Sequence, residues 1–340
     1  MLIKHPVWQA RIHRFRRNRL GFFSLIMFSL IFLACMGANL IANDKPILVN
    51  YQNHWYFPIV KSYPETTFGG VFETEANYQD PVVKDLINQH GYMIEPVIPF
   101  ADQTPSVMRS VPFPALPNAQ NWLGTDDQGR DVLARVLYGL RVSLLFGLAL
   151  TVAGSIIGIA VGAVQGYFGG WTDLVGQRLM EVWGGLPQLF MIIILVSLFS
   201  PSVFVLFGLM LLFGWMGLVG LVRAEFLRAR NFDYVRSAKA MGVSDAKIMF
   251  RHILPNAMSS SLSQLPFILT ANITALTTLD YLGYGLPAGS PSLGELISQG
   301  KDNLDSPWLA LAGFFSLTIV LSLLIFIGEA LRDAFDPRQS

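Results

Sequence analysis

The sequence predicts an all-α membrane protein with six transmembrane helices and a mixed, loop-rich external insert between the first and second helices. Apolar residues make up 52% of the 340 residues and charged residues only 14%, which is too few charges for an ordinary soluble chain. Six apolar stretches reach or approach the ~20 residues that cross a bilayer. Basic residues gather in alternate connections, as expected for segments that stay in the cytoplasm.

The six expected spans are joined by a tight turn at 200–202, by connections at 169–181 and 283–307 and by two longer segments. The spans cover 21–42, 142–168, 182–199, 203–222, 262–282 and 308–327. Six basic residues and no acid precede the first span, so residues 1–20 are expected in the cytoplasm. A secretory signal peptide is the alternative, but its apolar core usually has ~7–15 residues, fewer than this run.

Residues 43–121 are rich in proline, tyrosine, asparagine and acids and contain no long apolar run. An inside N-terminus places this insert on the external side of the membrane, either as a compact lobe that contacts a partner or as a long loop. Residues 122–141 are expected to form an amphipathic helix on the outer membrane surface, beginning near 126–127. Arg130 and Asp131 lie in this stretch. Without a functional role, they would form an exposed ion pair that contributes under ~1 kcal/mol to stability.

The segment 223–259 lies between two expected spans, yet it carries seven basic residues against three acids. This balance marks it as cytoplasmic, as does counting spans from an inside N-terminus, and the tail 336–340 falls on the same side. Within it, residues 233–256 are expected to form a helix, a hinge at Gly242 and a second helix that ends at Pro255. The first helix has one predicted apolar face, made of Tyr234, Val235, Ala238 and Met241.

Four glycines in the second expected span recur every fourth residue, which places them on one helix face. They are Gly154, Gly158, Gly162 and Gly166. Such a face lets a neighbouring backbone approach closely and predicts a helix-packing surface. The alternative is that they are ordinary glycines of a membrane helix.

A polar stripe on the fifth expected span predicts that this helix lines part of a translocation path. The stripe consists of Thr270, Thr274, Thr277 and Thr278. The alternative is that the threonines bond to their own helix and to neighbouring helices. Asp280 at the outer end of this span, assigned to the same path, needs water or a partner because charge is costly in a membrane.

The sequence argues against several other functions. No expected span carries an acid, lysine or histidine near its centre, as proton- or sodium-coupled carriers usually do. Gly300-Lys301 is followed by Asp302 where a phosphate-binding loop requires serine or threonine. With Cys35 alone and scattered histidines, no metal site or cofactor is expected on this chain. Energy is therefore expected to enter from another protein.

Two stretches resemble one transporter family. The segment 223–259 is similar to the cytoplasmic EAA loop of ABC importer permeases, matching at Gly242 and at 252–256 (HILPN), whereas Arg-Ser-Ala at 236–238 replaces the usual Glu-Ala-Ala. The run 122–133 (WLGTDDQGRDVL) resembles the signature before the second span of dipeptide and oligopeptide permeases.

The resemblance covers about residues 121–335 and implies a permease of the oligopeptide permease C-like group. Its large insert resembles the subgroup that takes up microcin C and peptides. The resemblance implies a five-span core over 142–335, alternating access for peptides or peptide-like compounds, and a place in the bacterial inner membrane with both termini cytoplasmic. Coupling to an ATPase would involve Asp233, Tyr234, Ala238, Met241, Gly242, His252 and Pro255.

The implied partners are a homologous second permease, two ATP-binding domains or a fused ATPase that carry ATP and Mg, a periplasmic solute-binding protein and membrane lipid. No enzyme activity and no nucleic acid are expected for this chain. The alternatives are a channel or secondary carrier that works alone, and a membrane-anchored receptor that works through the external insert.

Overall fold

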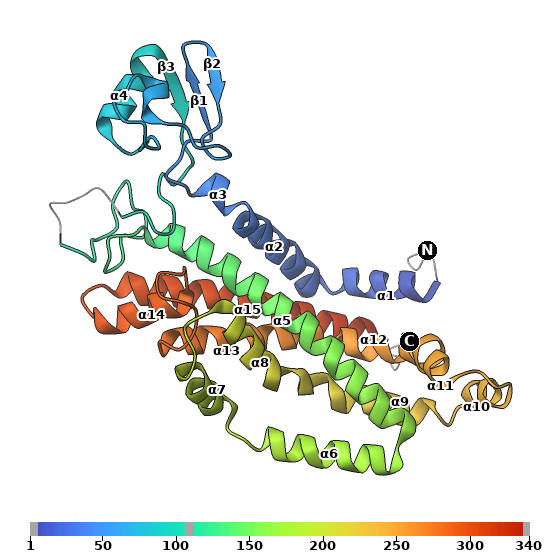
Figure 1. The fold of residues 1–340 in the computed structure, drawn as a ribbon. Helices are drawn as coiled ribbons and strands as arrows, with labels where there is room; N and C mark the ends of the chain where they lie inside the picture. The colour runs from blue at the N-terminus through green and yellow to red at the C-terminus, as the bar shows by residue number, and fades with distance from the viewer. Residues whose placement is uncertain (1–5, 106–111, 336–340) are drawn as a thin grey trace.

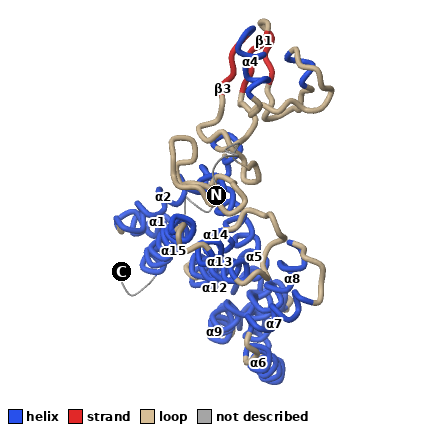
Figure 2. Tube along the Cα trace, turned by 90° about the vertical axis from the view of Figure 1, so that its left-hand side faces the viewer, coloured by secondary structure: helices blue, strands red, loops and turns tan. Residues whose placement is uncertain are grey.

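The structure is a computed structural model that describes residues 6–105 and 112–335. Long helices form a bundle, and a small lobe of strands and helices stands at one end of it (Figure 1). A view turned by 90° shows the strands gathered in this lobe (Figure 2). Helix α1 and the end of the last helix, α15, lie at the end of the bundle away from the lobe. The expected tail 336–340 and the first five residues fall outside the described residues.

The first part of the bundle consists of α1 (Pro6–Arg17), α2 (Arg19–Met36) and the short α3 (Ala38–Ile41). Asn18 separates α1 from α2 and caps α2, because its side-chain oxygen accepts a hydrogen bond from the Gly21 amide at 3.1 Å. Helix α2 packs along α15 so closely that a Cβ atom on Gly21 would lie 2.1 Å from the Cβ of Ala330.

The lobe is built on a three-stranded antiparallel sheet in the order β2-β1-β3, with β1 (Leu48–Tyr51), β2 (His54–Tyr56) and β3 (Gly91–Ile94). A 3-10 helix, η2 (Glu65–Phe68), and α4 (Pro81–His90) cover one face of the sheet. The lobe has its own core of Val49, Tyr51, Phe68, Ala76, Tyr78, Val83 and Ile87. This part of the insert is therefore a compact lobe and not a long loop.

Helix α5 (Val132–Phe168) has 37 residues and is about 56 Å long at 1.5 Å per residue. The helix expected over 122–141 is present from Val132 onward, but it does not begin near 126–127 and it is not separate from the second span. The side chain of Asp126 accepts hydrogen bonds from the Gln128 and Arg130 amides, which holds this stretch in a turn. The helix begins only after this turn and continues without a break through the expected second span.

The next part of the chain differs from the expected loop at 169–181 and single span at 182–199. It forms α6 (Gly170–Gly184) and α7 (Gln188–Ser197), two helices that meet at 71°. Pro187 lacks the amide hydrogen that would continue the helix, and it lies at the break. The following run contains α8 (Val203–Gly214), a 3-10 turn η3 (Trp215–Leu218) and α9 (Val219–Ala229).

The cytoplasmic loop predicted from the sequence consists of short helices. They are α10 (Asp233–Ala240), α11 (Asp245–Lys247), the π-helix η4 (Ile248–Ile253) and α12 (Leu254–Leu262). The expectation that Pro255 ends a helix is wrong, because Pro255 lies in the first turn of α12, where its missing amide hydrogen costs little. In the π turn before it, the Leu254 amide donates to the Met249 carbonyl five residues earlier.

The last part of the bundle contains α13 (Leu265–Tyr281), α14 (Leu293–Asp302) and α15 (Pro307–Phe335). The expected loop at 283–307 therefore includes a helix. Ser292 caps α14 by accepting hydrogen bonds from the amides of Gly294 and Glu295.

Within 6–105 and 112–335, four helical runs are long and apolar enough to cross a membrane: α2, α5, Val203–Ala229 and α15. The bent pair α6 and α7 qualifies as a fifth only if both helices are counted as one span. Helix α13 has 17 residues and is shorter than these runs. By length and composition, the six expected spans therefore have four or five counterparts.

Candidate functional site

The turn between α10 and α11 has the geometry that glycine favours. Gly242 has φ +76, its amide donates to the Lys239 carbonyl at 3.0 Å, and the Val243 amide donates to the Ala238 carbonyl at 3.1 Å. This pair of bonds is the Schellman arrangement, which ends a helix with a left-handed residue. Among the described residues, no heavy atom lies within 4 Å of where a Cβ on Gly242 would be, so the backbone conformation is what requires glycine.

The predicted apolar face of α10 divides into a buried and an exposed part. Val235 and Ala238 are buried in a cluster with residues of η4 and α9, whereas Tyr234 is 41% and Met241 75% exposed. The assignment of Ala238 to docking is therefore corrected, since its side chain packs inside the hairpin. Phe250 of η4 is 69% exposed, a residue that the sequence pattern did not single out.

The other predicted coupling residues lie at the two ends of this segment. Asp233 is exposed in the first turn of α10, where its charge faces the positive end of the helix dipole. His252 is half-buried in η4, and Pro255 is exposed in α12. The structure therefore does not gather all seven predicted residues on one surface.

One polar contact fixes the base of the hairpin to α5, and a second joins two of the neighbouring helices, α9 and α6. The Tyr167 hydroxyl at the end of α5 donates to the Asp245 carboxylate at 2.5 Å. Arg223 of α9 donates two hydrogen bonds to Asp173 of α6, one of them 2.6 Å long. A movement of the hairpin would therefore act directly on α5 and α9, and through the Arg223–Asp173 bonds on α6.

The four glycines of α5 face the backbone at the end of α8, in η3 and in α9, and we call this contact the glycine seam. A Cβ atom would lie 2.4 Å from the Trp215 carbonyl oxygen at Gly158, 2.7 Å from that of Val219 at Gly162 and 2.5 Å from that of Arg223 at Gly166. At Gly154 the nearest atom, the Gly214 oxygen, is 3.5 Å away, which is an ordinary contact.

The threonine stripe of α13 is bonded within its own helix. Each hydroxyl of Thr270, Thr274, Thr277 and Thr278 donates to the carbonyl four residues earlier, at 2.8–2.9 Å. Thr274 is exposed, but Thr277 is only 5% exposed, so the stripe does not face one environment. Asn272 points elsewhere and donates to the Thr151 hydroxyl of α5 at 3.0 Å.

Asp280 has its partners in the loop that follows α13. Its carboxylate accepts hydrogen bonds from the Leu286 amide at 2.7 Å and from the Ser292 hydroxyl at 2.6 Å. These bonds join the end of α13 to the start of α14. The sequence predicted that Asp280 needs water or a partner, and the structure supplies partners from the same chain.

A buried ion cluster of Asp126, Arg130, Arg135 and Glu295 was missed by the sequence pattern. Arg130 donates to Asp126 at 2.7 Å and to Glu295 at 3.1 Å, and the fully buried Arg135 donates to Glu295 at 2.7 Å. The alternative of an exposed Arg130–Asp131 pair is thus wrong, because Arg130 is 4% exposed and pairs with other acids. The sequence did contain one signal for this cluster, since Arg135 is a charged residue among apolar helix positions.

Asp131 has a separate role next to the ion cluster. It caps α5 by accepting from the Ala134 amide at 2.7 Å, and it accepts from the Asn121 side chain at 2.9 Å. Burial raises the pKa of this carboxyl above its usual value, although the hydrogen bonds to Ala134 and Asn121 favour its charged form. The signature 122–133 is therefore a folded connection that joins the lobe to α5 and α14.

The chain matches two family models. Residues 154–340 match "Binding-protein-dependent transport system inner membrane component", and this range contains all four glycines of the glycine seam and the hairpin. Residues 7–58 match "N-terminal TM domain of oligopeptide transport permease C".

Several curated proteins are similar to the chain. The inner membrane ABC transporter permease protein YejE of Escherichia coli (strain K12) is 56% identical over 335 residues, which cover 98% of each chain. The peptidoglycan transport system permease protein YejE of Agrobacterium fabrum is 50% identical over 359 residues, covering 98% of this chain and 94% of that one. The oligopeptide transport system permease protein OppC of Lactococcus lactis subsp. lactis is 37% identical over 222 residues, covering 64% of this chain and 76% of its own length.

These matches span the bundle, the hairpin and the lobe, and they agree with the apolar helices described above. The chain belongs to the binding-protein-dependent transport system inner membrane component family and is a multi-pass inner membrane permease of the ABC transporter type.

Proposed function

We propose that the chain is the permease subunit of an ATP-driven importer that moves peptides or peptide-like compounds, including microcin C-like ones, by alternating access. Relatives that match almost the whole chain or its core are named as permeases of an ABC transporter, of a peptidoglycan transport system and of an oligopeptide transport system. The partners in this proposal are a homologous permease, a pair of ATP-binding domains or a fused ATPase, and a periplasmic solute-binding protein.

The observation that carries the proposal is the form of the hairpin over α10, α11 and η4. Its tip presents apolar side chains to solvent, and its base is bonded to α5 and packed on α9. An exposed apolar patch rimmed by polar residues is typical of a protein docking site. Docking of the ATPase there would turn the hairpin, and the contacts at its base would pass that movement to the long helices.

The proposed topology has six spans with both termini in the cytoplasm and the lobe in the periplasm. It is supported by the basic character of 1–20 and 223–259 and by the placement of the lobe and hairpin at different ends of the bundle (Figure 1). In this topology α13 and the pair α6–α7 are spans, with Thr270, Thr274 and Thr278 on the path.

The lobe offers a surface for the solute-binding protein. Its sheet covers the lobe core with one face and exposes Trp55, Tyr92 and Ile94 on the other, where the two aromatic rings meet edge to face at 6.2 Å. Aromatic side chains are enriched at protein interfaces. Photo-cross-linking from position 55 should capture the binding protein in the assembled transporter.

The docking proposal is tested by Tyr234→Ala combined with Met241→Ala in proteoliposomes that contain the whole transporter. Both side chains are exposed, so the stability of the permease should change by under about 0.5 kcal/mol, while affinity for the ATPase should fall by about tenfold or more. Leu304→Ala is the matched control, because Leu304 is 82% exposed and lies in the connection between α14 and α15.

Normal peptide uptake and ATPase binding in the double variant would refute coupling through the hairpin tip. Solute flux through the chain alone, without any ATPase, would instead favour a channel or secondary carrier. Ala238→Asp is not a suitable test, because it would place a charge in the buried cluster and destabilise the hairpin.

A further inference from the structure

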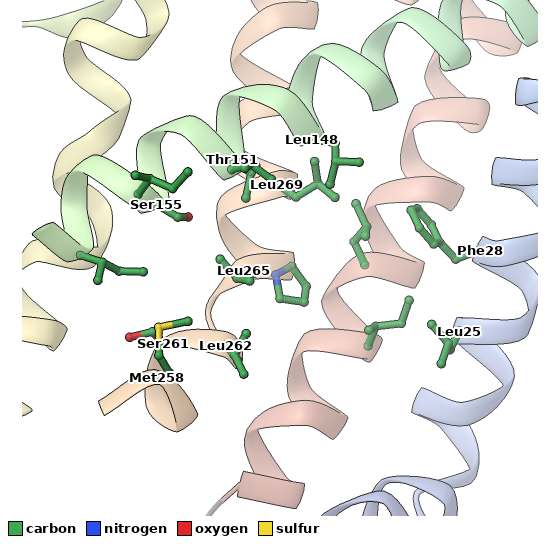
Figure 3. A pocket seen from close by; sticks show the side chains of 16 residues that line it. Leu25, Phe28, Leu148, Thr151, Ser155, Met258, Ser261, Leu262, Leu265 and Leu269 are labelled. Carbon is green, nitrogen blue, oxygen red and sulfur yellow. The ribbon is translucent and has the colours of Figure 1, made fainter. Parts of the chain in front are cut away.

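Two adjoining apolar spaces of about 400 and 580 Å³ lie beside the first helices of the chain. Side chains from α2, α5, α12 and α13 converge on the first of them (Figure 3). The two spaces share a wall made of Leu25, Leu262, Leu265, Pro266 and Ile327. The two spaces are therefore direct neighbours lined by apolar side chains, and we call the pair the α2 groove.

The mouth of the α2 groove is basic. Arg11 and Arg16 of α1 line it, and the Arg11 guanidinium lies over the ring of Phe335 at 4.6 Å from its centre. Residues 6–20 contain five arginines and no acid. The acids of α15 face away, because at 100° per residue Glu329 and Asp333 lie about 200° and 240° around the helix from Ile327.

The depth of the α2 groove matches half a bilayer. On α15 its lining begins at Phe335 and reaches Leu324, which is about 16 Å along the helix at 1.5 Å per residue. The hydrocarbon of one leaflet is about 15 Å thick, half of the bilayer core. An acyl chain whose headgroup lies at the arginines would therefore end near Phe28 and Leu148 at the deep end of the groove.

We propose that the α2 groove binds one anionic glycerophospholipid, with its phosphate at Arg11 and Arg16 and an acyl chain among the apolar side chains. Guanidinium groups donate charge-assisted hydrogen bonds to phosphate oxygens, and basic pockets between membrane helices favour anionic headgroups. The site rests on the proposed insertion of α2 and α15 in the membrane, with α1 at the cytoplasmic surface, and does not depend on which solute is transported. The lipid would fill the space between the first span and α13.

Native mass spectrometry of the full-length chain and of the complete transporter tests this site. The probes are phosphatidylglycerol and phosphatidylcholine with identical acyl chains. Replacing both mouth arginines, Arg11→Gln with Arg16→Gln, should weaken phosphatidylglycerol binding about 30-fold, since each arginine near an anionic surface contributes about fivefold. The matched control, Arg17→Gln with Arg19→Gln, removes the same charge from exposed positions that do not line the groove, and should weaken binding under about threefold.

A second variant tests the apolar part of the site. Leu265→Trp fills the shared wall without changing the charge, and it should abolish retention of phosphatidylglycerol. Equal weakening by the two arginine pairs, or equal affinity for phosphatidylcholine, would overturn the proposal. So would a complete transporter that excludes the lipid bound by the isolated chain, because a protein partner would then occupy the groove. Loss of peptide uptake with lipid binding intact would count only against the proposed transport function.

Discussion

The glycine seam predicts that one added methyl group has opposite effects at neighbouring positions of the same helix. Gly154 and Gly158 are both buried in α5, and each faces a backbone carbonyl across the seam. The Cβ of an alanine would lie 3.5 Å from the Gly214 oxygen at position 154 but 2.4 Å from the Trp215 oxygen at position 158. The first distance is an ordinary contact, and the second requires η3 and α5 to move apart.

The size of the difference follows from two opposing contributions. Alanine favours the helix by up to about 1 kcal/mol over glycine, and Gly154→Ala should keep this gain. Gly158→Ala should lose about 1–3 kcal/mol to overpacking, because a backbone carbonyl cannot rotate away as a flexible side chain can. Gly158→Ala should therefore be less stable than Gly154→Ala by about 2 kcal/mol, and Gly162→Ala and Gly166→Ala should behave like Gly158→Ala.

The single cysteine provides the assay. Cys35 is fully buried, so a thiol-reactive fluorophore labels it only when the purified protein unfolds. Denaturant titrations of the variants give the free energies of unfolding to be compared. Equal values for Gly154→Ala and Gly158→Ala, or a more stable Gly158→Ala, would refute the close approach of α5 to η3.

Two further predictions concern the connection between the lobe and α5, and both use the same thiol assay. Glu295→Gln removes a charge that faces Arg130 and the fully buried Arg135, so it should destabilise the protein by about 2–3 kcal/mol, after discounting for the 28% exposure of Glu295. The control is Glu181→Gln, which breaks an exposed ion pair in which Glu181 is 56% and Arg178 71% exposed, and it should change stability by under about 0.5 kcal/mol. Similar losses of stability in both variants would contradict a special role for the ion cluster. Burial raises the pKa of Asp131, so the folded state binds that proton more tightly than the unfolded state, and this carboxyl should stabilise the fold as the pH falls from 7 toward its usual value of about 4. Asp131→Asn keeps a helix-capping side chain and should lack this contribution, and pH profiles that superimpose would show that Asp131 does not titrate in this way.

Hydrophobic periodicity in the sequence predicted the main helices, and a helix–glycine–helix pattern predicted the hairpin. Both signals are local, since burial in a bilayer requires long apolar runs and a left-handed backbone favours glycine. The pattern failed where side chains bond to distant or unexpected partners. Asp126, for example, accepts hydrogen bonds from nearby backbone amides instead of starting a helix. The pattern also missed the helices α6 and α14, which form in segments expected to be loops.

The same limit applies to the candidate site. The glycine spacing predicted a packing face, but only the opposing carbonyls distinguish Gly154 from Gly158. The apolar pattern of α10 grouped Ala238 with Met241, although one is buried in the hairpin and the other is 75% exposed. Such differences depend on which element covers each face of a helix, and periodicity alone does not contain that information.

By itself, the sequence determined an apolar, mostly helical chain with basic connections and a polar insert, because hydropathy and charge act on each segment independently of the rest. Only the tertiary structure decided that Arg130, Arg135 and Glu295 form one buried cluster, since these residues come from segments more than 150 positions apart. It also decided that Arg11 and Arg16 of α1 lie at the mouth of the α2 groove, because that groove exists only where α2, α13 and α15 come together.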